Sequence, residues 1–214
     1  MVTRRDLEGT PFSYLRPPRA RKADLKLYEL PSGRVVVKDA ADKGRWVRSF
    51  VAWAIRRESR MLLEAQGVPG VPRHLGLIDS FGLAVEYVEG RPLKGASKRG
   101  GVPEAFVDRF ENLIAGLHAR GIVHLDARQK ANVLLDSEGR PWLVDFATAV
   151  YVGQSRLARV LVRLLGLPDA SAVAKYRLRY RVRRWPLSRK MLFYASSLLY
   201  YLLTGRFRHL PDGR

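Results

Sequence analysis

The sequence contains no cysteine, which excludes disulfides, thiolate metal sites and thiol redox chemistry. Long apolar runs are also missing. The longest, MLFYASSLLYYLL at residues 191–203, is shorter than the roughly 20 residues that a membrane-spanning helix needs.

Residues 1–22 carry charges that no continuous apolar stretch follows, so we expect no secretory signal and a mature chain that starts near Met1. With 214 residues, 47% of them hydrophobic, the chain fits a globular protein in a reducing compartment.

Acidic residues are scarce: 20 Asp and Glu stand against 39 Lys and Arg, for a formal net charge of +19. The basic excess is densest towards the C-terminus, where residues 156–190 hold eleven Lys and Arg and a single acid, Asp169. This balance favours a polyanionic partner, such as nucleic acid, anionic lipid or a phosphorylated substrate. A solvated, arginine-rich face is the alternative interpretation of the same run.

The first half of the chain has mainly strand signals. Residues 25–30 and 34–40 flank the turn sequence PSG, which predicts an antiparallel hairpin. Residues 74–88, HLGLIDSFGLAVEYV, predict two further short strands. Between them, residues 43–66 predict a helix, because apolar residues recur at helical spacing at Trp46, Phe50, Trp53, Ala54, Met61 and Leu62.

The second half has mainly helix signals. After a glycine-rich connector at residues 89–101, residues 103–120 have one apolar face and begin with proline, which predicts a helix. Three more helices are expected further on, over residues 153–167, 169–181 and 187–206.

One stretch in this half differs from its neighbours. Residues 121–150, GIVHLDARQKANVLLDSEGRPWLVDFATAV, contain two strand-like runs, NVLLD and PWLVDFA, joined by the turn SEGR. Asp126 lies in the loop before the first run, and Asp145 lies at the end of the second. Polar residues at strand ends often only cap turns, so a function for Asp126 and Asp145 can be inferred only together with the rest of the chain.

The order of these parts resembles the protein-kinase-like fold over roughly residues 25 to 150. The resemblance implies an α+β, bilobal protein with a small antiparallel-sheet N-lobe, residues 1–88, and a short helical C-lobe, residues 89–214. Lys38 in VVVKDA matches the strand lysine that holds nucleotide phosphates. Glu58 in RRESRMLLEA matches the helix glutamate that pairs with it, with Glu64 as a substitute partner.

The same resemblance assigns the other site residues. The main chain at Glu86 and Val88 in VEYVEG would bond adenine. In LHARGIVHLDARQKANVLL, Asp126 is the catalytic base. Phosphoryl transfer depends mainly on neutralising the charge of the phosphate oxygens and much less on covalent catalysis by the protein. Mg²⁺ prefers oxygen ligands. The implied cofactors are therefore ATP and Mg²⁺, with the metal held by Asn132 and Asp145, and with His124 and Phe146 in structural roles.

The sequence departs from the kinase pattern in several places. Asn132 follows Asp126 by six residues, one more than usual, and we expect a small bulge between Arg128 and Ala131 to absorb the difference. Ala147 replaces the glycine that usually follows Asp145 and Phe146. No Gly-x-Gly-x-x-Gly precedes Lys38. The region before it instead carries basic side chains that could grip phosphates, at Arg16, Arg19, Arg21 and Lys22.

No long activation segment ending in Ala-Pro-Glu follows Asp145. The shortened chain resembles the minimal bacterial kinases of the lipopolysaccharide-core (Kdo and heptose) group, and less closely the RIO-type kinases. The first resemblance implies transfer of the γ-phosphate of ATP to a hydroxyl of a core sugar or related glycolipid. The second implies a protein serine/threonine acceptor. A catalytically weak kinase-like scaffold that binds anionic membrane or nucleic acid is a further alternative.

The expected partners follow from these alternatives. An anionic glycolipid or sugar acceptor would meet the basic C-terminal run, and we assign the acceptor or membrane contact to Arg181, Arg183 and Arg184. No helix-turn-helix, zinc-ligand spacing or aromatic RNA-binding motif is present, so specific nucleic-acid binding is not expected. We expect a cytoplasmic protein, with peripheral contact at the inner membrane surface as an open alternative. Residues 191–203 would then be either a buried helix or an interfacial one.

Overall fold

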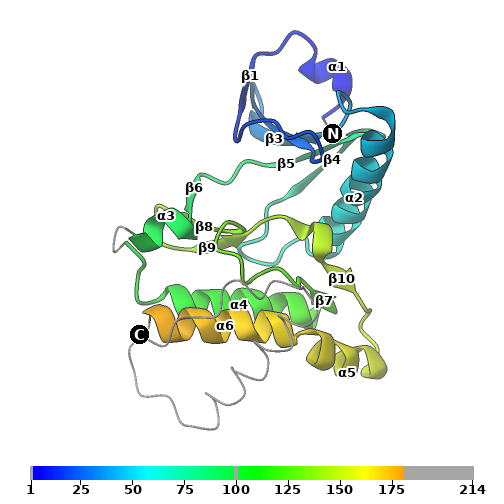
Figure 1. Ribbon diagram of the computed structural model, residues 1–214. Coiled ribbons are helices and arrows are strands. Elements are labelled where there is room, and N and C mark those ends of the chain that lie inside the picture. The colour runs from blue at the N-terminus through cyan, green and yellow to red at the C-terminus, as the bar shows by residue number, and fades with distance from the viewer. Residues whose placement is uncertain (1, 99–100, 181–214) are drawn as a thin grey trace.

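The computed structural model of this protein describes residues 2–98 and 101–180. The fold is mixed α+β, as expected, and Figure 1 shows a sheet with one long helix beside it, stacked on a second, mainly helical region. This arrangement is compatible with a small bilobal kinase-like fold. The boundary expected between residues 88 and 89 stays a prediction.

The sheet is antiparallel, has five strands in the order β1-β2-β3-β5-β4, and places Lys38 at its centre. The predicted hairpin is confirmed as β2 and β3, and the two strands predicted next are confirmed as β4 and β5. The bounds are β1 Phe12–Tyr14, β2 Asp24–Leu30, β3 Gly33–Asp39, β4 His74–Asp79 and β5 Gly82–Glu86.

The helix α2, Arg45–Glu64, packs against one face of this sheet and confirms the helix predicted over residues 43–66. Val36 and Leu83 from the sheet join Val51, Ile55 and Leu62 from α2 in the main hydrophobic core. Because side chains alternate along a strand, Lys38 shares the face of Val36 and so points towards α2.

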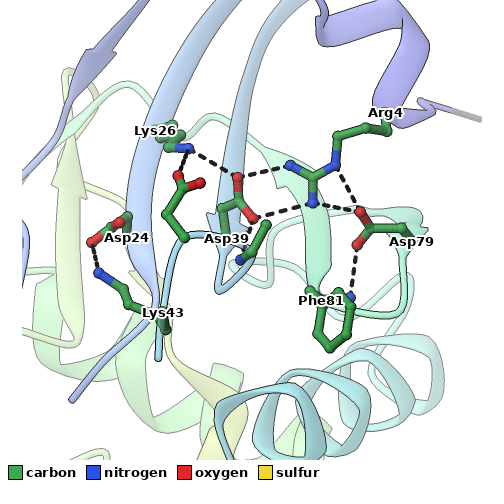
Figure 2. A network of polar contacts seen from close by, with 9 residues as sticks. Arg4, Asp24, Lys26, Asp39, Lys43, Asp79 and Phe81 are labelled. Atoms are coloured by element: carbon green, nitrogen blue, oxygen red, sulfur yellow. Dashed lines mark hydrogen bonds and ion pairs between the residues drawn. The ribbon is translucent and has the colours of Figure 1, made fainter. Parts of the chain in front are cut away.

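The opposite face of the sheet is covered by the N-terminal residues. Leu7 of the short helix α1, Arg4–Leu7, packs on a second apolar cluster that includes Val35 and Val37 of β3. Arg4 donates to the buried carboxylate of Asp39 at 2.9 Å and to Asp79 at 2.7 Å, and Lys26 bonds Asp39 from the other side at 2.9 Å (Figure 2). These ion pairs tie α1 to the centre of the sheet.

The second region is built on two neighbouring helices, α4 (Phe106–Ala119) and α6 (Leu167–Tyr180). Their shared core is aromatic, since Phe106 and Phe110 of α4 contact Tyr176 and Tyr180 of α6 at ring-centroid distances of 5.0 to 5.8 Å. The predicted helix over residues 103–120 is confirmed, although it begins three residues after Pro103. Two helices predicted after residue 150 are also confirmed, as α5 (Arg156–Leu165) and α6.

Short strands carry the chain between these helices. The two runs of the stretch 121–150 form β8 (Val133–Asp136) and β9 (Pro141–Leu143), as predicted. The glycine-rich connector at 89–101 contains two elements that the sequence did not predict. Gly90–Pro92 pairs with β8 as strand β6, and Leu93–Lys98 forms helix α3. Strand β7 (Ile122–Val123) pairs with β10 (Val150–Tyr151), and the 3₁₀ turn η1 spans Phe146–Thr148.

Among the described residues, no helix is long and apolar enough to cross a bilayer.

Candidate active site

The strand lysine and the helix glutamate named from the sequence form a direct ion pair. Lys38 Nζ on β3 lies 2.6 Å from Oε1 and 2.7 Å from Oε2 of Glu58 on α2. The Glu58 side chain is only 4% exposed, whereas the substitute partner Glu64 is exposed at the end of α2. Glu58 is therefore the partner of Lys38, and the pair links the sheet to the helix.

The electrostatics of this pair include a third charged group, Asp145, whose Oδ1 lies 3.5 Å from Lys38 Nζ. Burial alone would lower the pKa of Lys38, but the carboxylates of Glu58 and Asp145 outweigh it, so the pKa of Lys38 is raised. The cation at Lys38 in turn lowers the pKa of Asp145. Burial raises the pKa of Glu58, against the opposing effect of Lys38. The short contacts and the raised pKa of Lys38 identify a charged lysine between two carboxyl groups.

Asp145 reaches this position through an unusual backbone conformation. It has a left-handed φ of 68° immediately before η1, and its side chain is 48% exposed. The next residue, Phe146, donates its N–H to Glu58 Oε1 at 3.1 Å, so Glu58 holds both Lys38 and the segment after Asp145. Leu125, beside Asp126, is the other non-glycine residue with positive φ in the described chain, at 67°. Strain of this kind concentrates at functional sites, and here one instance is Asp145 itself and the other is the residue before Asp126.

His124 lies inside the core beneath this site. Its ring contacts that of Phe146 edge to face at 4.8 Å, and its Nδ1 accepts the N–H of Asp126 at 3.3 Å. Burial lowers the pKa of His124, which favours a neutral ring. His124 thus packs against both aspartate-bearing segments, in keeping with the structural role expected for it and for Phe146.

The loop that carries Asp126 is held in place by Asp169, which was not predicted as a site residue. Asp169, fully buried on α6, accepts the N–H groups of His124 at 2.8 Å and Leu125 at 2.9 Å, and contacts His118 Nε2 at 3.1 Å. A carboxylate rarely occupies a core without such donors. In the sequence, Asp169 stands out because it is the single acidic residue between residues 156 and 190.

Further contacts from α6 fix the loop after Asp126. The Tyr176 hydroxyl donates to the carbonyls of Ala127 at 3.2 Å and Arg128 at 3.1 Å. Lys175 Nζ donates to the Arg128 carbonyl at 2.9 Å, and burial together with the nearby charge of Arg128 lowers the pKa of Lys175 to about 8. The loop is therefore held by α6 from Asp169 to Tyr176.

Local turns take up the stretch that contains the extra residue before Asn132. Gln129 N–H bonds the Asp126 carbonyl and Asn132 N–H bonds the Gln129 carbonyl, so the chain turns twice between them. Asn132 Nδ2 consequently lies 3.1 Å from Asp126 Oδ2. Gln129, which was not predicted as a site residue, donates through Nε2 to both Asp126 oxygens, at 2.8 and 2.6 Å.

The two residues expected to hold a metal lie on adjacent segments. The N–H of Val144 donates to the Asn132 carbonyl at 2.9 Å, which brings Asn132 next to the residue preceding Asp145. One carboxylate and one amide oxygen fit Mg²⁺, which prefers oxygen ligands and takes the remainder from water and phosphate. Over residues 2–98 and 101–180, no group of three or more His, Cys, Asp or Glu gathers as a metal site. These two residues would thus hold the ion together with a bound nucleotide.

The expected hinge follows directly from the sheet. Glu86 ends β5, and its N–H donates to the Arg73 carbonyl at 2.9 Å. Its side chain accepts the Arg73 N–H at 3.0 Å, and Val88 is buried two residues later. The adenine contacts of Glu86 and Val88 stay a prediction. Two calls lie outside the described residues: the acceptor or membrane contact expected at Arg181, Arg183 and Arg184, and the buried or interfacial helix expected over residues 191–203.

Comparison with known proteins gives two distant relatives, while no family model matches the chain. The chain is 31% identical over 184 residues to "CBL-interacting protein kinase 16" of Oryza sativa subsp. japonica, covering 83% of this chain and 39% of that protein. It is 31% identical over 157 residues to a "Probable bifunctional tRNA threonylcarbamoyladenosine biosynthesis protein" of Methanosarcina acetivorans, covering 67% of this chain and 27% of that protein.

The chain therefore spans well under half the length of either relative, and the likeness concerns only part of those proteins. Neither relative points to the lipopolysaccharide-core or RIO-type families in particular. The two relatives support the assignment of this chain, with its α+β fold, to a kinase-like superfamily.

Proposed function

We propose that this protein is an ATP-dependent phosphotransferase that acts on a hydroxyl acceptor. The observation that carries the proposal is the convergence of Lys38, Glu58 and Asp145 from β3, α2 and the segment before η1. A half-buried lysine paired with two carboxylates is weak evidence for stability, and groups that shift one another's pKa in this way cluster at functional sites. The rice relative, which is named a protein kinase, is consistent with this use of the site.

Each residue has a distinct role in this proposal. Lys38, oriented by Glu58, would bind the nucleotide phosphates, and the main chain at Glu86 and Val88 would bind adenine. Asn132 and Asp145 would hold Mg²⁺, which supplies neutralisation of phosphate charge when bound. Asp126 would accept the proton of the acceptor hydroxyl, and the Gln129 amide at its two oxygens would fix the direction of that carboxylate.

The loop between β1 and β2 would cover the phosphates in place of a glycine-rich loop. Arg16 lies in this loop, is held by a bond to the Ala23 carbonyl at 3.3 Å, and contributes to the lowered pKa of Asp145. An arginine whose charge acts on Asp145 is suited to binding a phosphate held at that carboxylate by a metal ion. Basic side chains of this loop would then bind the phosphates in place of the backbone amides of a glycine-rich loop.

For the acceptor we propose an anionic glycolipid or a sugar of the lipopolysaccharide-core type, with the protein cytoplasmic and peripheral to the inner membrane. Only β10 and a short loop separate η1 from α5, so little surface is available there for an extended peptide. The net charge of +19 suits an anionic acceptor, which Arg181, Arg183 and Arg184 would contact. A protein acceptor is the second candidate, favoured by the name of the rice relative. A scaffold without turnover is the third.

The test is transfer of radiolabelled γ-phosphate from ATP, with and without Mg²⁺, to lipopolysaccharide, to small sugars and to a generic protein mixture. The matched variants are Asp145→Asn, which removes the metal-binding charge, and Asp126→Ala, which removes the base. We expect Mg²⁺-dependent labelling by the parent, none by Asp145→Asn, and weak labelling by Asp126→Ala at unchanged ATP affinity. Mg²⁺-dependent ATP binding without labelling of any acceptor would favour the scaffold, and equal activity of all three proteins would refute these roles.

A further inference from the structure

The helix α5, Arg156–Leu165, leaves most of its apolar side chains uncovered. Only Ala158 and Val162 are buried, whereas Leu157 is 69% and Leu164 61% exposed. Val160 and Leu161 are also exposed. These four residues, spaced at i, i+3, i+4 and i+7, form one stripe on the helix surface. We call Leu157, Val160, Leu161 and Leu164 the α5 stripe.

The charged residues of α5 are all basic and lie beside this stripe. At about 100° per residue, Arg156, Arg159 and Arg163 share a neighbouring face, next to Val160. No acid occurs within the helix. An exposed apolar face bordered by arginine is typical of a helix that lies in a membrane interface.

The arginine face also borders a hollow. A depression of about 390 Å³ between α5 and the helices behind it is lined by Arg159, Arg163 and His118, among others. Guanidinium groups bind phosphates, so Arg159 and Arg163 suit the phosphate of a lipid headgroup. The four residues of the α5 stripe do not line the depression, which lies on the arginine side of the helix.

The position of α5 in the fold exposes this surface. Figure 1 shows α5 at one edge of the helical region, beyond the ends of α4 and α6. It follows β10, which pairs with β7, and β7 leads directly into His124 and Asp126. A surface bound through α5 would therefore be connected to the candidate active site by a single pair of short strands.

We propose that α5 is an interfacial docking helix that binds the surface of an anionic lipid bilayer, with the α5 stripe entering the acyl boundary and Arg156, Arg159 and Arg163 contacting lipid phosphates. Charge complementarity decides among the occupants. A second copy of this chain would bring another set of arginines, and a net charge of +19, to the same face. The inference deepens the peripheral membrane location included in the proposed function, and it can be tested separately because docking requires neither ATP nor an acceptor.

The experiment measures binding of the full chain to vesicles without nucleotide. Vesicles of phosphatidylcholine with about one third phosphatidylglycerol are compared with phosphatidylcholine alone. The stripe variant is Leu157→Ser/Leu161→Ser/Leu164→Ser, and the charge variant is Arg156→Gln/Arg159→Gln/Arg163→Gln. The matched control is Trp46→Ser/Phe50→Ser on α2, whose side chains are 87% and 68% exposed.

We expect the parent to bind anionic vesicles and the α2 control to bind equally well. The stripe variant should bind at least about tenfold more weakly, and the charge variant about a hundredfold more weakly at low salt. Because the chain has no cysteine, a single Leu164→Cys carrying an environment-sensitive dye can report insertion. Its emission should shift to the blue on anionic vesicles, while a dye at Ser49→Cys on the exposed face of α2 should not shift.

Several results would overturn the proposal. Absence of parent binding to anionic vesicles would do so, as would equal losses in the stripe variant and the α2 control. A stripe variant that melts at a lower temperature but binds vesicles like the parent would show that protein covers the stripe. A parent dimer that the stripe variant dissociates, without any vesicle binding, would identify a second copy as the occupant. Loss of kinase activity alone would leave the docking surface standing.

Discussion

The carboxylate of Asp169 accepts the main-chain N–H of His124 at 2.8 Å, although the two residues are 45 positions apart. This bond joins the core of α6 to the loop that presents Asp126. The second oxygen accepts the N–H of Leu125, the residue with a left-handed backbone. The strained turn before the candidate base is thus stabilised by a buried charge from another element.

Replacing Asp169 by Ala should therefore loosen the loop and destabilise the fold. The N–H groups of His124 and Leu125 would lose their acceptor and His118 would lose its partner, so we expect the free energy of unfolding to fall by about 3 kcal/mol. Turnover should fall as well, because Leu125 would relax. Urea denaturation followed by circular dichroism measures the first effect. Glu104→Ala, at an exposed acid, is the control, and equal stability of the two variants would remove Asp169 from this role.

The Lys38–Glu58 pair allows a double-mutant cycle. Lys38→Met should cost about 3 kcal/mol of unfolding free energy, because it leaves the buried Glu58 carboxylate without its cation. Glu58→Gln should cost less, because Lys38 is half-buried and keeps Asp145 as a partner. The double variant should cost less than the sum, since neither charge then remains. ATP binding should be weakened strongly by Lys38→Met. Strictly additive losses in the cycle would contradict a direct pair.

Asp39 should make stability depend on acid pH. Burial would raise its pKa, but bonds from Arg4, Ala41 and Lys26 overcome this and hold the pKa at about 2, below the ordinary 3.8. Its folded-state pKa is depressed, so its contribution is complete above about pH 4 and disappears as the pH falls towards 2.

The measurement for Asp39 is the unfolding free energy from pH 6 to pH 2 in the parent and in Asp39→Asn. We expect the parent to lose about 2 kcal/mol more than the variant over the acid limb. Arg4→Gln should reduce the same difference, because it removes the strongest partner of Asp39. Parallel curves for the parent and Asp39→Asn would show that Asp39 does not titrate with folding.

Gln129 should act by positioning Asp126. Gln129→Ala removes two short amide contacts to the carboxylate, so we expect turnover to fall by about tenfold while the KM for ATP stays unchanged. Gln129→Glu should be worse than Ala, because a second carboxylate would face the first. Steady-state kinetics on the acceptor identified by labelling provide the measurement. A changed KM for ATP with unchanged turnover would contradict the positioning role.

The sequence predicted the main elements of the sheet and the order of site residues, because both depend on local patterns. It did not predict which side of α2 is buried. Trp46, Phe50 and Trp53 recur at helical spacing, yet they are exposed, and the buried face instead carries Glu58 and Ser59. The polar Glu58 is buried because Lys38, from a distant strand, compensates its charge.

Contacts between distant segments account for the other missed features. Asp169 contacts the loop only because α6 packs beneath it. Gln129 reaches Asp126 only because the turn folds back on that residue. Strand β6 was missed for the same reason, since Gly90–Pro92 extends only by pairing with β8. A short segment that contains glycine and proline has no strand propensity of its own.

Two neighbouring residues of β3 are held from opposite sides of the sheet, Lys38 by Glu58 and Asp39 by Arg4 and Lys26. A slip of β3 by one residue would exchange these faces, because the side-chain period of a strand is two. After a slip in one direction, the face towards α2 would receive an aspartate beside Glu58 in place of a lysine, and the ion pairs on the other face would receive the wrong sign. The alternating charges thus act as a register lock, which ties the sign of the group facing Glu58 to the correct pairing of the central strand.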